Sequence, residues 1–242
     1  MKRDMTGRTG TVLGITVVCG LLAAAGHVVS ASAGGPAESL DRLRTGNAKF
    51  VAAPQEALPI DAARRTALVQ GQTPFATVLS CADSRVPPEV VFHTGLGDLF
   101  VVRAAGEVTD KSILASVEYA SEHLQVPLVV VMGHEMCGAV KAAIETPAGK
   151  SLGPNLDYML KAIRPAVARS AAEPAAARLR AAILANVEES INDLVSESHI
   201  LRHLVETHKL AIVGGYYELG SGRVFFSEPV ESIAGITSET GK

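Results

Sequence analysis

Three runs of apolar residues in the middle of the chain are almost unbroken by polar positions. They read FATVLS (75–80), LFVVRAAG (99–106) and PLVVVMGH (127–134). Strands that are apolar on both faces are typical of a parallel sheet with helices on both sides. The runs therefore predict three buried parallel strands.

Helical spacing separates and follows these strands. Between the second and third strands, apolar residues recur at Ile113, Val117, Ala120 and Leu124. This spacing predicts a helix and hence a strand, helix and strand crossover unit. Further helices are predicted over residues 39–51, 61–70, 156–168, 174–197 and 198–207.

A fourth strand and a hairpin complete the pattern. LAIVGG (210–215) reads as a strand, and Gly220-Ser221-Gly222 separates two apolar runs, as in a hairpin turn. The predicted fold class is α/β, with a central, mainly parallel sheet of four strands plus a C-terminal antiparallel strand, flanked by helices, and an N-terminal helical arm. We expect a single catalytic domain over residues 34–242, because no internal repeat or second core is present.

The first 33 residues have the order of a secretory signal peptide. Lys2, Arg3 and Arg8 precede the apolar run VLGITVVCGLLAAAG, and Ala31-Ser32-Ala33 supplies the small residues of a cleavage site. A membrane anchor is the alternative, but the run is shorter than the ~20 apolar residues that span a bilayer. We expect removal of residues 1–33, no stable membrane anchor afterwards, and a periplasmic or secreted protein.

The charge distribution argues against a nucleic-acid partner. The 242 residues carry a formal net charge of −3, and their lysines and arginines are scattered. No basic stripe interleaved with aromatic residues is present in the sequence. A hydrophobic fraction of 48% is ordinary for a globular domain.

Two cysteines and one histidine fall where predicted strands end. We expect Cys19 to be lost with the leader, which would leave Cys81 after the first strand, and His134 and Cys137 after the third. The carboxyl ends of parallel strands meet at one edge of a sheet, where ligands collect. Thiolate and imidazole are ligands that zinc prefers, and three protein ligands with an open fourth position are typical of catalytic zinc. Taken singly, each residue is better explained as a core cysteine or a hydrogen-bonded histidine, but their joint placement favours a metal site.

The spacing of His134 and Cys137 bears on how their side chains meet. His134 and Cys137 are three positions apart in the sequence. They would share one face if a helix began at His134.

A carboxylate and a guanidinium accompany the first cysteine. SCADSRVPPE (80–89) places Asp83 and Arg85 close to Cys81. An exposed loop ion pair contributes only about 0–1 kcal/mol to stability. Beside a metal, however, an arginine fork is suited to hold a carboxylate off the ion through two hydrogen bonds. We therefore interpret Asp83 and Arg85 as candidate catalytic residues.

The sequence resembles one known enzyme family. CADSR (81–85) with GHEMC (133–137) resembles the paired CxDSR and HxxC signature of the β-class carbonic anhydrases, and LRTGNAKF, GDLFVVRAAG, Asn186-Val187 and IVGGYYELGSGRV are similar to other stretches of it. The resemblance implies that Cys81, His134 and Cys137 bind one zinc ion per subunit, with water or hydroxide in the fourth position. It also implies a homodimer or a higher even oligomer, with the N-terminal helices packed on the neighbouring subunit.

The resemblance implies an activity as well: the reversible hydration of carbon dioxide to bicarbonate and a proton by attack of zinc-bound hydroxide. Asp83 would accept a hydrogen bond from the hydroxide, and Arg85 would hold Asp83 away from the metal. In some members the aspartate swings onto zinc and gives a closed, inactive form, so the resting position of Asp83 stays open. Zinc with neutral histidine ligands lowers the pKa of bound water to ~7. Because two thiolates cancel the charge of zinc, we expect a less acidic water here and activity that rises above neutral pH.

Several positions depart from the usual pattern of that family. FHTG (92–95) stands where many members have FDQG, so Thr94 replaces a glutamine credited with orienting substrate, and its hydroxyl could take over that task. RAAGE (103–107) replaces the more usual RNAGN, and Glu135, between two ligands, is expected to face solvent. His93 is a candidate proton shuttle only because imidazole titrates near neutrality. A surface or packing role is the better interpretation of His93.

Three alternatives remain open at this point. A non-catalytic zinc module predicts a fourth protein ligand and no hydration activity. A thiol redox protein predicts a disulfide between Cys81 and Cys137 in the oxidised protein, although a CxxC arrangement is missing. A zinc hydrolase of the same fold would act on carbonyl sulfide or carbon disulfide, and a narrowed or apolar pocket entrance would favour it.

Overall fold

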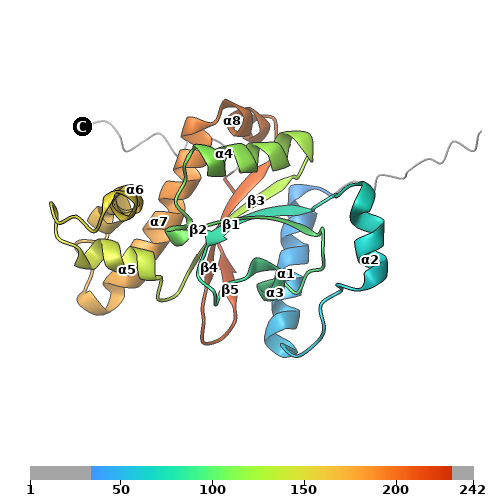
Figure 1. The fold of residues 1–242 in the computed structure, drawn as a ribbon, viewed down its shortest axis with the longest axis horizontal. Coiled ribbons are helices and arrows are strands. Elements are labelled where there is room, and N and C mark those ends of the chain that lie inside the picture. Colours follow the sequence, from blue (N-terminus) through green and yellow to red (C-terminus); the bar gives the residue numbers. More distant parts are fainter. Residues whose placement is uncertain (1–33, 231–242) are drawn as a thin grey trace, which may run out of the picture. The chain divides into compact units, whose positions relative to one another are not determined.

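The sheet has four parallel strands and one antiparallel strand, as predicted. The computed structural model describes residues 34–230, and these contain a five-stranded sheet in the order β2-β1-β3-β4-β5 (Figure 1). Its first four strands pair in parallel, and β5 runs antiparallel to β4. The α/β fold class is therefore confirmed. The strands are β1 (Ala76–Cys81), β2 (Leu99–Ala104), β3 (Leu128–His134), β4 (Ala211–Tyr217) and β5 (Val224–Phe226).

Two predictions fall outside the described residues. The leader, with Cys19, lies before residue 34, and the last twelve residues of the expected domain, 231–242, lie beyond residue 230. The signal peptide and the single domain over residues 34–242 therefore stay predictions. Among the helices of residues 34–230, none is long and apolar enough to cross a membrane.

Strand β3 shows why the apolar runs are unbroken. All of its seven residues are buried. Leu128, Val130 and Met132 face one cluster of core side chains, whereas Val129 and Val131 face a second cluster. Alternate side chains of a strand point to opposite faces of the sheet. A central strand that is covered on both faces consequently has no position that suits an exposed polar residue.

Helices cover both faces of the sheet. The first core cluster joins it to α1 and α3, and the second joins it to α4 and α8, which lie together on the opposite side (Figure 1). The long helix α7 contributes side chains to both clusters. The predicted N-terminal helix is present as α1, with Leu40 and Leu43 buried. The helices are α1 (Pro36–Ala52), α2 (Ala62–Ala67), α3 (Pro88–Val91), α4 (Lys111–Glu118), α5 (Gly138–Glu145), α6 (Pro154–Arg169), α7 (Ala175–Glu197) and α8 (His199–Glu206).

The crossover helix buries a somewhat different face from the predicted one. Val117 and Ala120 are buried as expected, but Ile113 and Leu124 are only half-buried. For Leu124 the reason is that α4 continues as a π-helical turn over Tyr119–His123, just before that residue. A π turn holds more residues than an α turn, so a projection at 3.6 residues per turn loses its register there.

The predicted hairpin forms between β4 and β5. Glu218 N–H donates to the carbonyl of Arg223, and Gly222 N–H donates back to the carbonyl of Glu218. Gly222 has a φ of 73°, a left-handed conformation that glycine adopts without steric penalty. The glycine-rich stretch is therefore a turn.

Candidate metal centre

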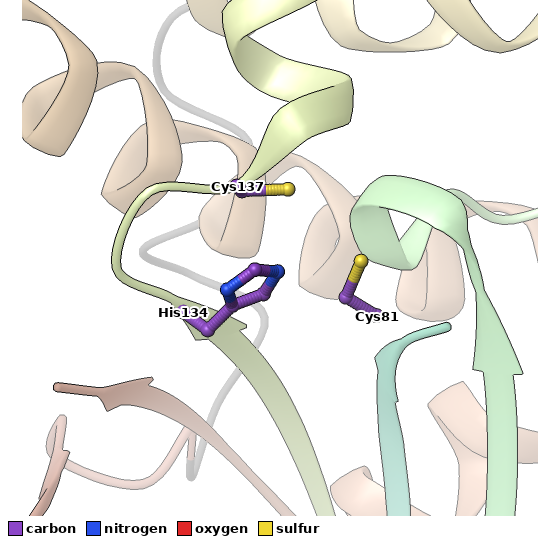
Figure 2. Close-up of side chains that lie close together, drawn as sticks. All are labelled: Cys81, His134 and Cys137. Atoms are coloured by element: carbon purple, nitrogen blue, oxygen red, sulfur yellow. The ribbon is translucent and has the colours of Figure 1, made fainter. Parts of the chain in front are cut away.

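Two neighbouring strands and one helix bring Cys81, His134 and Cys137 together (Figure 2). Cys81 is the last residue of β1 and His134 the last of β3, and these two strands are paired. Cys137 precedes the first residue of α5. One possible ligand atom from each residue lies within 4.8 Å of the other two, and all three side chains are buried. The predicted grouping at the carboxyl edge of the sheet is confirmed.

His134 and Cys137 do not share a helical face, and that expectation was wrong. His134 still belongs to β3, and α5 begins only at Gly138. Between them, Met136 has a φ of 55° and turns the chain sharply. The approach of the two side chains therefore comes from a tight turn between strand and helix.

The imidazole of His134 is oriented by the backbone carbonyl of the next residue, Glu135. Nδ1 lies 2.9 Å from the carbonyl oxygen of Glu135. A carbonyl oxygen only accepts hydrogen bonds, so Nδ1 carries the hydrogen and Nε2 keeps its lone pair. Nε2 is buried and forms no hydrogen bond of ordinary geometry within the described part of the chain. Burial disfavours a charged imidazole, but the neighbouring Cys81 sulfur outweighs burial and raises the pKa of His134. It lies on the side of the two sulfur atoms (Figure 2).

The two cysteines are free thiols with different surroundings. Cys137, then the imidazole of His134, then the backbone N–H of Gly106 lower the pKa of Cys81 to about 4, against the opposing effect of burial. Gly106 N lies 3.3 Å from Cys81 Sγ. The hydrogen bond that Cys137 makes to the Cys81 sulfur raises the pKa of Cys137, and burial raises it further. The shared hydrogen bond therefore favours the thiolate at Cys81 over the thiolate at Cys137.

Arg103 fixes the backbone that follows β1. Its Nε donates to the carbonyl of Cys81 at 3.0 Å, and its Nη2 donates to the carbonyl of Asp83 at 2.5 Å. Because Arg103 lies on the neighbouring strand β2, the guanidinium ties the loop to the sheet. The segment that carries both a cluster cysteine and the nearby carboxylate is thus held at two points.

Asp83 rests on Arg85. Arg85 Nε donates to Oδ1 at 2.9 Å, Nη2 donates to Oδ2 at 2.8 Å, and the backbone N–H of Arg85 donates to Oδ1 at 2.9 Å. These hydrogen bonds hold the pKa of Asp83 well below its usual range. Asp83 Oδ2 is nevertheless only 3.9 Å from His134 Nε2. The carboxylate therefore stands at the edge of the cluster while it is bound by its arginine.

Comparisons with known proteins identify the family. The sequence model described as carbonic anhydrase matches residues 76–224. The chain is 36% identical over 199 residues to carbonic anhydrase 2 of Mycobacterium tuberculosis, covering 82% of this chain and 96% of that protein. The solved tetrameric β-carbonic anhydrases of Sordaria macrospora superpose with a TM-score of 0.60 at 25% identity, covering 78% of this chain and 94% of theirs. The chain belongs to the β-class carbonic anhydrase family.

A second relative, also named as a carbonic anhydrase, matches over a similar length. The carbonic anhydrase of Mycolicibacterium smegmatis is 37% identical over 195 residues, covering 78% of this chain and 92% of that protein. The chain thus spans nearly the whole length of these carbonic anhydrases. The resemblance seen in CADSR and GHEMC is confirmed at the level of the family.

The positions that depart from the carbonic anhydrase pattern have mixed outcomes. Glu135 does not simply face solvent, since it is half-buried and its Oε2 accepts from the backbone N–H of Leu219 at 3.0 Å. Thr94 is buried, and its hydroxyl donates to the carbonyl of Glu89 at 3.3 Å. His93 lines a cavity of about 870 Å³ beside α1, whose lining includes none of the three cluster residues. Substrate orientation by Thr94 stays a prediction.

Sequence reasoning overlooked one group behind the cluster. Glu107 was noted only as a departure in RAAGE, but its side chain is fully buried and close enough to Cys81 and His134 to interact with their charges. Burial raises the pKa of Glu107 to about 8. Asn186, from α7, donates to its Oε1 at 2.9 Å. A usable signal was available, because a carboxylate one turn beyond β2 must lie near the same edge of the sheet.

The residues present fit a zinc ion. The donor set is two cysteine sulfurs and one imidazole nitrogen, which zinc prefers. The decisive observation is the buried Nε2 of His134, because a lone pair without a partner is costly in a protein interior. Nδ1 donates to a backbone carbonyl, as the distal nitrogen of a metal-bound histidine ordinarily does. A zinc ion would satisfy Nε2 and both sulfurs together.

Proposed function

We propose that this carbonic anhydrase catalyses the reversible hydration of carbon dioxide to bicarbonate and a proton, with one zinc ion held by Cys81, His134 and Cys137. The supporting observation is the unpartnered Nε2 of His134, which is aimed at two buried sulfurs next to an arginine-bound carboxylate. When bound, zinc supplies the Lewis-acid chemistry that makes water a nucleophile near neutral pH. The three side chains bind the ion, and the rest of the chemistry falls to Asp83 and Arg85.

Asp83 acts as a hydrogen-bond acceptor at the mouth of the site. Its carboxylate stays ionised across the physiological pH range, because Arg85 lowers its pKa. It accepts a hydrogen bond from the attacking water and so directs the water's lone pair toward carbon dioxide. Arg85 keeps both carboxylate oxygens occupied with hydrogen bonds, and this prevents Asp83 from turning onto the cluster.

A stopped-flow assay of hydration, run beside zinc analysis, tests the proposal. Wild-type protein should contain about one zinc per chain and hydrate carbon dioxide. Cys81→Ser should lose both zinc and activity, because a serine hydroxyl is a far poorer zinc ligand than a thiolate. Wild-type protein that holds its full zinc and shows no hydration at any pH would refute the assignment.

The alternatives have less support. Cys81 and Cys137 are free, rather than joined as a redox protein would predict. No fourth histidine, cysteine or carboxylate joins the cluster within residues 34–230, although a structural zinc module calls for one. No contact of the described residues favours carbonyl sulfide or carbon disulfide over carbon dioxide.

We infer that residues 1–33 are removed and that the enzyme acts outside the cytoplasm. The support is the order of basic residues, apolar run and Ala31-Ser32-Ala33. Mass spectrometry of the protein from a periplasmic or secreted fraction should give a chain that begins at Gly34. A chain that retains Met1 in that fraction would contradict the inference.

We further propose a homodimer or a higher even oligomer. The Sordaria macrospora relatives are tetrameric, and this chain exposes Ile60 and Val69, two large apolar side chains on either side of α2, by 50% and 75%. Sedimentation velocity should report an even multiple of the mature mass. A monomer at micromolar concentration would refute the proposal.

A further inference from the structure

The N–H group that contacts Cys81 comes from a turn with an unusual backbone. Gly106 has a φ of 69° and Glu107 a φ of 42°, so two successive residues are left-handed. Such a conformation costs a residue other than glycine about 1–3 kcal/mol. A side chain at Gly106 would also collide, because its Cβ would lie 2.8 Å from Ile163 Cδ1. Contacts outside the turn must therefore hold this backbone in place.

Helix α7 supplies those contacts. Asn186 Nδ2 donates to the carbonyl of Gly106 at 2.7 Å and also to Glu107 Oε1 at 2.9 Å. Ser190, one helical turn further along, donates from its hydroxyl to the carbonyl of Glu107 at 3.0 Å. The Asn186 amide group is thus shared between the turn's backbone and the Glu107 carboxyl.

The Glu107 carboxyl lies deep in the protein and against the strand that carries His134. Its residue is 0% exposed, and Oε2 has no hydrogen-bond partner within the described residues. A Cβ added to Gly133, the residue before His134, would lie 3.4 Å from Oε1. Burial raises the pKa of Glu107 to about 8, which favours the neutral acid at neutral pH. A buried carboxyl is expensive to retain, and the hydration chemistry does not use it.

We propose that Glu107 is a positioning residue of the metal centre: its carboxyl accepts from Asn186 and thereby holds the turn whose Gly106 N–H contacts the sulfur of Cys81. Without this acceptor, one hydrogen of the buried Asn186 amide has no partner, and the amide can rotate away from Gly106. The turn then relaxes and the N–H···S contact weakens. The inference rests on the proposed function only in treating Cys81 as a zinc ligand.

Zinc affinity and a cobalt spectrum test this role without an activity assay. Glu107→Met keeps the side-chain volume and removes the acceptor, whereas Glu107→Gln keeps an oxygen for Asn186. Competition with a chromogenic chelator should show that Glu107→Met binds zinc about tenfold more weakly than wild type, the usual effect of losing a contact behind a metal ligand. Glu107→Gln should stay within about twofold of wild type.

The cobalt(II)-substituted proteins report on the sulfur itself. A hydrogen bond stabilises the lone pair of a thiolate, so its loss lowers the energy of thiolate-to-cobalt charge transfer. The near-ultraviolet band of Glu107→Met should move to longer wavelength, and that of Glu107→Gln should stay in place. Wild-type zinc affinity and an unmoved band in Glu107→Met would overturn the proposal. So would a Glu107→Gln protein as impaired as Glu107→Met.

Two further variants separate positioning from general destabilisation. Asn47 is another buried amide that donates to backbone carbonyls, those of Val91 and Gly222, in a network without cluster residues. Asn47→Leu should lower the unfolding midpoint but leave zinc affinity and the cobalt band unchanged. A loss of zinc affinity equal to that of Glu107→Met would contradict the proposal.

If Glu107→Met does not fold, Ser190→Ala removes one hydrogen bond from the same turn and should weaken zinc binding about threefold. Unchanged affinity in Ser190→Ala would then count against the proposal.

The outcomes for this residue and for the enzyme are distinguishable. A wild-type protein that binds zinc but does not hydrate carbon dioxide refutes the proposed function. The affinity and cobalt comparisons between Glu107→Met and Glu107→Gln would still decide the role of Glu107 in that case.

Discussion

Two carboxyl groups flank the same cluster in opposite environments. Asp83, at the mouth, has a side chain that is 19% exposed and receives hydrogen bonds from the charged fork of Arg85. Glu107, at the back, is fully buried and receives one hydrogen bond from the neutral amide of Asn186. The pKa of Asp83 is held below its usual range, whereas that of Glu107 rises to about 8.

Hydrogen-bond partner and burial, rather than residue type, assign different roles to the two carboxyl groups. An ionised carboxylate beside a cation suits a hydrogen-bond acceptor that faces substrate. A carboxyl without a cationic partner is kept neutral by desolvation and suits an internal anchor. One metal centre can therefore use two acidic side chains without gathering two extra negative charges next to its thiolates.

The largest effect should come from removing the charge at the mouth. Asp83→Asn keeps the shape of the side chain but makes it a weaker acceptor of the hydrogen bond from the attacking water. We expect kcat/KM for hydration to fall about 10²–10⁴-fold while zinc content stays near one per chain. Stopped-flow kinetics with metal analysis checks this, and a variant as fast as wild type would place the acceptor elsewhere.

A smaller effect is expected from weakening the arginine fork. Arg85→Lys keeps a positive charge but cannot hold both carboxylate oxygens in a planar fork. The pKa of Asp83 should move back toward its ordinary value, and the carboxylate gains freedom to approach the cluster. We expect roughly a tenfold loss of kcat/KM, most marked at acidic pH. An unchanged pH–rate profile would show that the fork does not position Asp83.

The pH dependence of the wild-type activity shows whether the metal site or one of the two carboxyl groups controls the rate. Asp83 does not titrate near neutrality, because its pKa is lowered. Because the two thiolates weaken the Lewis acidity of zinc, activity should rise several-fold from neutral to alkaline pH. The same rise should persist in Glu107→Gln, where the carboxyl is gone. A profile already flat from about pH 6, or a rise that vanishes in Glu107→Gln, would contradict this account.

The smallest effect on rate is expected at the back of the site. Glu107→Gln should leave kcat/KM within about twofold but should change how stability depends on pH. The folded chain holds the Glu107 proton up to about pH 8, whereas the unfolded chain releases it near pH 4.5. Across that window the unfolded state binds fewer protons, so wild-type stability falls as pH rises.

Urea unfolding of the metal-free proteins measures this linkage. Relative to Glu107→Gln, the wild type should lose on the order of 5 kcal/mol of stability across the window. Equal pH dependence in the two proteins would mean that Glu107 is ionised in the folded state. The contrast between the two carboxyls would then disappear.

Much of the site could be read before the structure. Cys81 and His134 end apolar runs, and parallel strands bring their carboxyl ends to one edge, so the local pattern already placed the ligands together. The resting position of Asp83 could not be read in this way, because an aspartate two residues from both a cysteine and an arginine can turn to either. In the structure the loop, which Arg103 holds, places Asp83 on Arg85.

Contacts between distant residues account for what was missed. Glu135 was expected in solvent, but its carboxylate is bound by Leu219, 84 positions away. The partner of Glu107 is Asn186, 79 positions away on a helix that crosses the sheet. The π-helical turn after α4 changes a helical face without any sequence pattern that announces it.

Local sequence patterns did not predict α3 or α5, but they predicted the order of the five strands, most of the helices, the donor atoms of the cluster and, through CADSR and GHEMC, the family. These follow from local periodicity and from the types of side chain at strand ends, which are properties of short segments. The tertiary structure alone decided which carboxyl is ionised, which is buried and which backbone N–H reaches the sulfur of Cys81. Such features depend on desolvation and on partners supplied by remote elements, so no short segment contains them.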